Sequence, residues 1–453
     1  MTVVESGKGV IIKKGNNLKY VYVSNSAKVE KMENFFFSCK DLIGHPFGSA
    51  FKVLDKERLL KIDPVLVETH NQEYENAGSN LEDTSGDNRE IQDDSNSQRL
   101  GKNEIEAMRD EGKSGEEIVK EIVENSSTFQ GRNIFSKSKY LKKKNKKYIA
   151  HFVVLKPTTR LLAEMYFQKN PTKILELRPD TLAQILTYSN VQFGSKVLVL
   201  ETCQGLVAGS ILERLGSKGS ILQIYQGSFP VRIVMEQFNY SEVDTDNVLC
   251  SYPLEKLGIL PDLLKSGKSD EDLIEFILGK HKDEQEHIKK IEISKNLVDC
   301  NLDTEEIPLT KIGEKRKFKK NESEERKTNF TNIGGVRFLS REKRMQETLT
   351  ALKLLRNNDF ESLILVSKYH PKLPLLTLLD YLPPSCPFVV YFTHQEPLME
   401  CFVNLKDKQC ATNLELTESW FRNIQVLPKR THPEIVMSGT GGYLLRGIKV
   451  DPS

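Results

Sequence analysis

Residues 197–216, VLVLETCQGLVAGSILERLG, have the pattern of a turn that binds a nucleotide-like cofactor. An apolar, strand-like run ends in Glu201, a short turn follows, and an amphipathic helical pattern begins. In this setting glycines adopt positive φ and let the backbone approach a cofactor that lies at the carboxyl end of the first strand. The chemistry that this segment suggests is therefore cofactor binding.

The turn departs from a working cofactor loop at several positions. Only Gly205 occupies its tight part, while Cys203 and Val207 stand where further glycines are expected, and a β-branched residue resists positive φ. The next strand ends in the neutral amide of Gln226, although a carboxylate makes the stronger hydrogen bonds to ribose hydroxyls. Three such changes at about 1–2 kcal/mol each would reduce a micromolar affinity to millimolar. The sequence thus predicts a turn kept for packing, with no cofactor in this chain; a differently shaped pocket that tolerates these side chains is the alternative.

Strand-like and helix-like segments alternate around this turn. One block covers residues 156–266, and the pattern resumes over residues 330–453. Strand-like runs lie at 196–200, 220–225, 362–366 and 387–392. Alternation of this kind predicts a parallel sheet with helices on both faces. Two last β-rich runs, 421–427 and 442–450, are expected to pair at the sheet edge, where an antiparallel pair would match the Rossmann-like methyltransferase fold.

The rest of the chain divides by composition. Residues 1–70 are rich in β signals and predict part of a small β-barrel or sandwich, while residues 71–101 are acidic, polar and predicted to be disordered. Residues 102–155 contain two short helical pieces, a lysine-rich segment and a strand that leads back to the barrel. Residues 267–329 are charge-dense and are predicted to be a largely disordered insertion in a surface loop.

Composition excludes several classes of protein. At 453 residues the chain is long enough for two or three domains, and its net charge of +2 with 28% charged residues indicates folded domains interrupted by polar inserts. Its seven cysteines form no CxxC pair and no metal-ligand array, so we expect reduced thiols and no metal site. No run approaches the ~18 apolar residues of a membrane span, and the N-terminus lacks an apolar signal core. We expect a soluble intracellular protein without membrane association.

A second candidate for chemistry follows the strand at 362–366. The sequence continues as SKYHPKLP, without an aspartate or glutamate where an amine-directed methyltransferase keeps a carboxylate for the substrate's proton. Lys368, Tyr369 and His370 could form a catalytic trio at this edge. A histidine before proline at a strand end is more often structural, and we favour that interpretation.

The lysine-rich segment at 136–148, SKSKYLKKKNKKY, carries the main candidate contacts with nucleic acid. Ammonium groups bind phosphates with release of counterions, and tyrosine rings can stack on exposed bases. The candidate residues are Lys137, Lys139, Tyr140, Lys142, Lys143, Lys144, Lys146, Lys147 and Tyr148. A solvated helix face or linker is the alternative interpretation.

Two further basic features are weaker candidates. Arg160 and Arg178 border the α/β block and could face RNA, although isolated arginines usually form surface ion pairs. The run KIGEKRKFKK at 311–320 is typical of a flexible RNA contact or a nuclear import signal, and a merely solubilising insert is the third interpretation.

Several longer motifs occur in the order found in one known family. They are CKDLIGHPFGSAF, NSSTFQGRNIFSKSKYLKKKNKKY, FVVLKPTTRLLAEMYFQKNPTKILELRPDTLAQIL, VLVLETCQGLVAGSILERLGSKGSILQIYQG, VSKYHPKLPLL, FVVYFTHQEPL and HPEIVMSGTGGYLLRG. Across most of its length the chain resembles the non-catalytic subunits of the eukaryotic tRNA (adenine-58-N1)-methyltransferase. The acidic and basic inserts match poorly, so nothing is carried over to them.

This resemblance implies an N-terminal β-barrel and a methyltransferase-like C-terminal domain. It also implies assembly with a paralogous catalytic subunit that binds S-adenosylmethionine, in a heterotetramer of two plus two subunits, with tRNA held across both types. On this basis we expect a nuclear, non-catalytic subunit that binds and positions tRNA for N1-methylation of adenosine 58. The alternatives are an active S-adenosylmethionine-dependent RNA methyltransferase with an atypical loop, and a translation-initiation scaffold acting on initiator tRNA.

Overall fold

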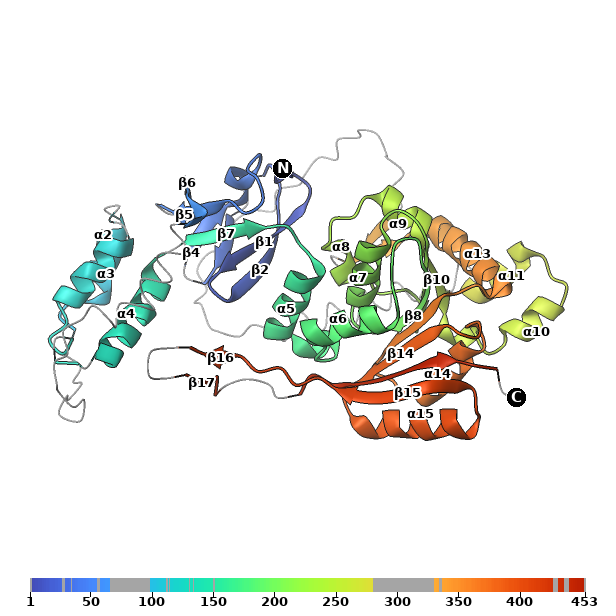
Figure 1. Ribbon diagram of the computed structural model, residues 1–453. Helices are drawn as coiled ribbons and strands as arrows, with labels where there is room; N and C mark the ends of the chain where they lie inside the picture. Colours follow the sequence, from blue (N-terminus) through green and yellow to red (C-terminus); the bar gives the residue numbers. More distant parts are fainter. Residues whose placement is uncertain are drawn as a thin grey trace, which may run out of the picture. The chain divides into compact units, whose positions relative to one another are not determined.

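The computed structural model describes residues 2–65, 98–279 and 330–451, apart from short gaps at 27–28, 34, 55–57, 111–112, 114, 130, 133, 150, 334–335, 427–430 and 436–439. The described chain forms two compact units (Figure 1). The N-terminal unit contains residues 1–165, 237–239 and 422–437, and the α/β unit contains residues 166–236, 240–421 and 438–453. Most of the acidic segment predicted at 71–101, and all of the basic run at 311–320, lie outside the described residues.

The N-terminal unit is built on an antiparallel sheet with the strand order β2-β1-β7-β5-β6. Its strands are β1 (Gly9–Lys14), β2 (Asn17–Tyr22), β5 (Ala50–Val53), β6 (Leu59–Ile62) and β7 (His151–Leu155), and β3 (Val29–Met32) pairs with β4 (Phe35–Ser38) in a separate hairpin. Alternating apolar residues turn one face inward, where the rings of Phe37 and Phe51 lie 5.0 and 5.8 Å from that of Phe152. The predicted N-terminal β domain is confirmed.

Three α-helices lie in the described residues between 98 and the start of β7. They are α2 (Lys102–Asp110), α3 (Gly115–Glu124) and α4 (Ile134–Tyr148). Helix α3 contacts both α2 and α4. The three pack around a small apolar core that includes Met108, Ile118 and Ile122. The two helical pieces expected here are confirmed as α2 and α3, and the lysine-rich segment is α4.

The α/β unit is built on a seven-stranded sheet with the order β10-β9-β8-β13-β14-β18-β15. The bounds are β8 (Lys196–Glu201), β9 (Ser220–Tyr225), β10 (Leu249–Pro253), β13 (Ser362–Val366), β14 (Pro387–Phe392), β15 (Ala411–Glu418) and β18 (Tyr443–Lys449). The first five strands in this order are parallel, and β18 runs antiparallel between β14 and β15. The predicted Rossmann-like sheet is confirmed. Its strand order reverses between β8 and β13, which is the point where such sheets bind ligands.

The expected pairing of the two last β-rich runs is wrong. The run at 442–450 contains β18, but its partner on the outer side is β15, a strand that was not predicted. The run at 421–427 contributes only β16 (Ile424–Gln425), which pairs with β17 (His432–Pro433) in a separate two-stranded sheet. Strand β15, ATNLELTE, was missed because a half-exposed edge strand lacks the apolar run of the central strands.

Helices cover both faces of this sheet. On one face α11, α13, α14 and α15 share a core with Leu198, Leu222 and Leu363, whereas α6 and α7 contact β14, β8 and β9. The helices of the α/β unit are α6 (Pro179–Tyr188), α7 (Leu206–Leu215), α8 (Ile233–Glu236), α9 (Glu242–Val248), α10 (Leu260–Lys265), α11 (Asp270–Leu278), α13 (Arg341–Asn357), α14 (Lys372–Leu379) and α15 (Gln395–Asp407), with the hairpin β11 (Phe330–Ile333) and β12 (Val336–Leu339) before α13. Helix α5 (Thr159–Lys169) begins in the N-terminal unit and ends in the α/β unit. Within the described residues, no helix is long and apolar enough to cross a membrane.

The boundary expected for the second insert needs correction. The charge-dense segment was predicted to begin at residue 267, but α11 follows that position, and its Leu273, Ile274 and Ile277 are buried in the core of the α/β unit. The helix was overlooked because its exposed face is strongly acidic, which gave the segment the composition of an insert.

Candidate functional site

At the switch point of the sheet, strand β8 ends in a buried carboxylate. Strand β8 brings Glu201 to the carboxyl edge of the sheet, and α7 begins after Gly205, whose φ is 86°. The two oxygens of Glu201 accept hydrogen bonds from the backbone N–H groups of Val207 (3.1 Å) and Ala208 (2.8 Å). Free N–H groups in the first turn of a helix form the usual binding site for an anionic ligand. Here the chain's own carboxylate occupies them.

The environment of Glu201 resists its ionisation. Burial raises the pKa of this carboxyl to about 7, against the opposing effect of the two backbone hydrogen bonds and of the Arg232 charge. The negative charge that stabilises the N-terminus of α7 is therefore partly titrated near neutral pH.

The side chains that replace glycines in this turn belong to the core. Cys203 and Val207 are both fully buried, and the Cys203 thiol donates a hydrogen bond to the carbonyl oxygen of Ile174 (3.5 Å). Burial raises the pKa of the thiol well above its usual value. The structure thus places both side chains in the protein interior, which differs from the obstruction of an open cofactor path that the sequence suggested. The physical reason is that residues 206–212 of α7 are buried on all sides.

A short segment of the same chain packs against the turn. We call residues 229–236, which include the single helical turn α8, the α8 segment. The backbone N–H of Val234 donates to the carbonyl oxygen of Gln204 (2.8 Å). A Cβ added to Gly205 would lie 2.9 Å from the Cα of Arg232 and 3.0 Å from the Cβ of Met235. The side of Gly205 that would face the ligand in a cofactor loop is therefore in contact with the α8 segment.

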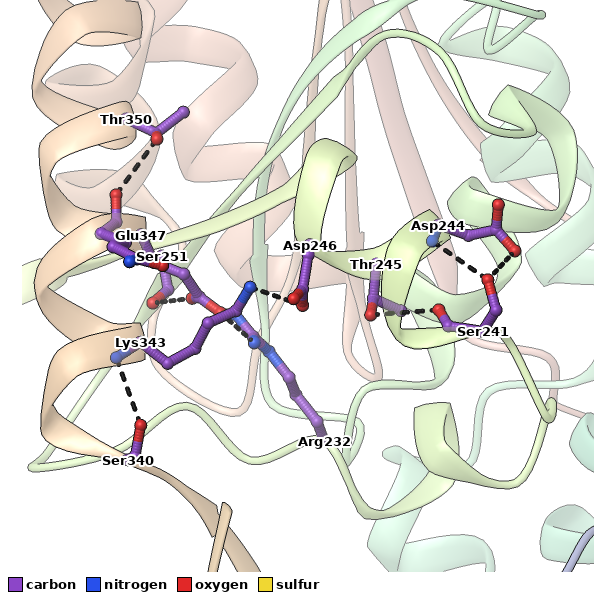
Figure 2. Close-up of polar contacts among 11 residues, drawn as sticks. Arg232, Ser241, Asp244, Thr245, Asp246, Ser251, Ser340, Lys343, Glu347 and Thr350 are labelled. Atoms are coloured by element: carbon purple, nitrogen blue, oxygen red, sulfur yellow. Dashed lines mark hydrogen bonds and ion pairs between the residues drawn. The ribbon is translucent and has the colours of Figure 1, made fainter. Parts of the chain in front are cut away.

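A buried polar network holds the α8 segment in this position (Figure 2). The guanidinium of Arg232 donates two hydrogen bonds of 2.9 Å to the two carboxylate oxygens of Glu347 on α13. The Glu347 side chain is buried, and the Arg232 side chain is only 10% exposed. The Ser251 hydroxyl on β10 donates to Glu347 (2.6 Å), and Arg232 Nε donates to the side-chain oxygen of Gln223 on β9 (2.8 Å). Two parallel N–H···O bonds fix geometry as well as charge. The network therefore connects the α8 segment to two strands and one helix.

A second cation on α13 supports the same segment. Arg344 is buried and its guanidinium lies 4.6 Å from the ring centroid of Phe229, the first residue of the α8 segment. The adjacent residue Lys343 forms an ion pair with Asp246 (Figure 2).

This network is not predictable from local sequence patterns. Arg232 and Glu347 are 115 positions apart, so no local spacing relates them. One signal was available: Glu347 lies on the buried stripe of α13 that also contains Ala351 and Leu355. A carboxylate on a buried stripe needs a partner.

The remaining candidates at the carboxyl edge lie at the surface. Gln226 follows β9 and is exposed. The backbone N–H of Lys368 donates to the Thr202 hydroxyl (2.9 Å), which joins the ends of β13 and β8. His370 is about half exposed and its Nε2 lies 3.3 Å from Glu400 on α15. Lys368, Tyr369 and His370 are thus engaged in surface and backbone contacts.

The lysine-rich helix α4 presents its side chains in two different environments. Lys139, Lys143 and Lys147 are exposed, whereas Lys137 is buried and Lys144 is half-buried. Burial lowers the pKa of Lys144. Lys142 and Lys146 belong to the same helix. The helix therefore divides the candidate lysines instead of exposing them all.

The two tyrosines of α4 are engaged within the protein. Arg132 and Lys144 each lie 5.2 Å from the ring centroid of Tyr140, and Phe129 lies at 5.5 Å. The Tyr140 hydroxyl donates to Gln98 (3.3 Å). Tyr148 is half-buried, with Lys147 over its ring at 5.2 Å.

The two candidate arginines also differ in solvent exposure. Arg160 on α5 is exposed. Arg178 is buried and pairs with Asp180 through hydrogen bonds of 2.9 and 2.6 Å, with a further bond to the carbonyl oxygen of Ser419 (3.2 Å). Burial opposes ionisation of Asp180, but the Arg178 guanidinium outweighs it and lowers the pKa of that carboxyl. Arg178 joins the start of α6 to the end of β15.

These features define the class of the protein. The strand order with an antiparallel β18 and the turn at the switch point are those of a class I methyltransferase-like domain, here joined to a β-rich N-terminal unit. The chain belongs to the Gcd10p family, whose family model matches residues 3–295.

The chain is similar to two named relatives and to one solved structure. The chain is 38% identical to a protein of Mus musculus over 99% of this chain and 88% of that one, and 32% identical to a protein of Dictyostelium discoideum over 99% and 80%. Both relatives bear the name tRNA (adenine(58)-N(1))-methyltransferase non-catalytic subunit TRM6. Among solved structures, tRNA (m1A58) methyltransferase TrmI from Aquifex aeolicus matches 99% of this chain and 100% of its own, with 11% identity and a TM-score of 0.44.

Proposed function

We propose that this chain is the non-catalytic subunit of a tRNA methyltransferase complex that forms N1-methyladenosine at position 58 of tRNA. In that role it binds and positions tRNA and supports a catalytic partner. The observation that carries the proposal is the closed cofactor turn, in which Glu201 occupies the N-terminus of α7 and the α8 segment contacts Gly205. The names of the relatives from Mus musculus and Dictyostelium discoideum support the same role.

The cofactor belongs to the partner in this proposal. A ligand at the turn would have to displace the α8 segment and break the buried Arg232–Glu347 pair, which is costly because it leaves an uncompensated charge. S-adenosylmethionine is therefore expected to bind a paralogous catalytic subunit. The same closed turn disfavours the alternative of an active methyltransferase with an atypical loop.

The assembly and its location complete the proposal. We infer a heterotetramer of two non-catalytic and two catalytic subunits, located in the nucleus, with tRNA held across both types. The exposed lysines of α4 support a role in RNA binding, since ammonium groups contact phosphates.

Co-purification with the catalytic subunit tests the proposal. Methyl transfer to tRNA is expected from the mixed complex, and none from this chain alone. Isothermal titration of this chain with S-adenosylmethionine is expected to give no heat of binding, while the complex binds the cofactor. Turnover by this chain alone, or a stoichiometric micromolar complex between it and the cofactor, would overturn the proposal. Binding to initiation complexes that persists without the catalytic partner would favour the translation scaffold instead.

A further inference from the structure

Helix α4 has an inner and an outer face. Lys137, Tyr140, Lys144 and Tyr148 recur at intervals of three and four residues, and all four are buried or half-buried. Lys139, Lys143 and Lys147 recur every four residues and are all exposed; we call these three residues the outer stripe. The periodicity of the helix therefore separates one lysine-rich segment into two sets of side chains.

The inner face anchors the helix. The ring of Tyr140 packs with Phe129, and its hydroxyl bonds to Gln98. At the end of α4, a Cβ added to Gly115 would lie 2.4 Å from the carbonyl oxygen of Tyr148, so α3 begins directly against the backbone of α4. The side chains of Tyr140 and Tyr148 also pack against the apolar core of the three helices, so both rings are poorly placed to stack on bases.

The outer stripe has the geometry for phosphates. Successive residues of the stripe are about 6 Å apart along the helix axis, and all three lie within an arc of about 80° around that axis. Each ammonium group can therefore meet a different phosphate along one strand. Lysine is a flexible point charge with three donors, which suits phosphate contact without a fixed orientation. Contacts of this kind position a nucleic acid but carry no sequence information.

We propose that the outer stripe of α4 contacts consecutive stretches of one RNA strand through its phosphates, and that α4 reads no base. The inference rests on the proposed function, since it takes tRNA as the bound polyanion. Among the seven candidate residues of this helix whose side chains the structure describes, it narrows the RNA contact to three exposed lysines.

The test is the salt dependence of tRNA binding by the complete complex. The variant K139Q/K143Q/K147Q is compared with the wild type by fluorescence anisotropy over a range of KCl concentrations, with two tRNAs of different sequence. Each lost phosphate contact lowers the slope of log K against log salt by about one, so a decrease of roughly three is expected. The affinity near physiological salt should fall about tenfold or more, equally for both tRNAs.

Two control variants make the result specific. K139R/K143R/K147R keeps the charges and should bind as the wild type does. K265Q/K406Q/K408Q removes three exposed lysines of the α/β unit, so it matches the change in net charge and should leave the slope nearly unchanged. Circular dichroism of each variant checks that α4 remains folded. An unchanged slope for K139Q/K143Q/K147Q, an equal loss in the α/β control, or a loss confined to one tRNA sequence overturns the inference. Failure of the wild-type complex to bind tRNA would overturn the proposed function as well.

Discussion

The carboxylate of Glu201 lies 2.8 Å from the backbone nitrogen of Ala208 and accepts its hydrogen bond inside the protein. A helix N-terminus at this point of a Rossmann-like sheet normally faces a bound ligand. In this chain the acceptor comes from the preceding strand, and the α8 segment closes the outer side of the turn. The fold of a cofactor-binding domain is retained while its binding surface is part of the core.

The titration of Glu201 predicts a pH-dependent stability. Its pKa is raised by burial to about 7, so the folded chain keeps the proton at pH values where the unfolded chain has lost it. The contribution of this group to stability is fully present below about pH 4.5 and is lost as the pH rises through about 7, by on the order of 3 kcal/mol. Urea unfolding at pH 5 and pH 8 measures the difference, which E201Q should reduce. E418Q, at an exposed position on β15, should leave it as in the wild type.

Removing the carboxylate of the buried network should destabilise the α/β unit strongly. E347A leaves Arg232 buried without its partner, and the expected loss is about 3–5 kcal/mol in the free energy of unfolding. The double variant R232M/E347L should recover most of it, because an apolar pair can replace a buried ion pair. The matched control is R356A, which breaks the more exposed Arg356–Asp270 pair and should change the unfolding midpoint little. Equal effects of E347A and R356A would contradict the assignment of a buried network.

The contact between Gly205 and the α8 segment can be isolated with a second glycine. Gly205 and Gly227 have φ values of 86° and 88°, but a Cβ meets Arg232 only at Gly205, with open space at Gly227. G227A therefore reports backbone strain alone, of about 1–3 kcal/mol. G205A should cost more and should increase hydrogen exchange in residues 229–236. Similar hydrogen exchange in residues 229–236 of the two variants would show that the α8 segment is not held by its contact with Gly205.

Substitution of the two candidate arginines should have different effects on stability and on tRNA binding. R178A removes the buried partner of Asp180 and the link to Ser419, so it should lower the thermal midpoint of the α/β unit without changing the salt slope of tRNA binding. R160A, at an exposed position, should change the free energy of unfolding by no more than about 0.5 kcal/mol. If Arg160 contacts a phosphate, R160A reduces the salt slope by about one. A reduced salt slope of tRNA binding in R178A would show that Arg178 contacts RNA, against this prediction.

Much of the fold could be predicted from local patterns. Strands β8, β9, β13 and β14 are recognisable as continuous apolar runs in the sequence, because central parallel strands are buried on both faces. The edge strand β15 and helix α11 were not predicted, because their exposed faces have the composition of loops. Their buried residues are recognised only by what they pack against.

The strand, the tight turn at Gly205 and the helix, without the glycines of a cofactor loop, can be recognised from the amino-acid sequence because these features depend on neighbouring residues. The density of lysine in α4 is likewise visible in the sequence. Which lysines face solvent, and which segment packs against the turn, depends on how the helices and strands pack. Arg232 and Glu347 meet across 115 positions of sequence because α13 packs against β10, and no local pattern records a contact made by packing.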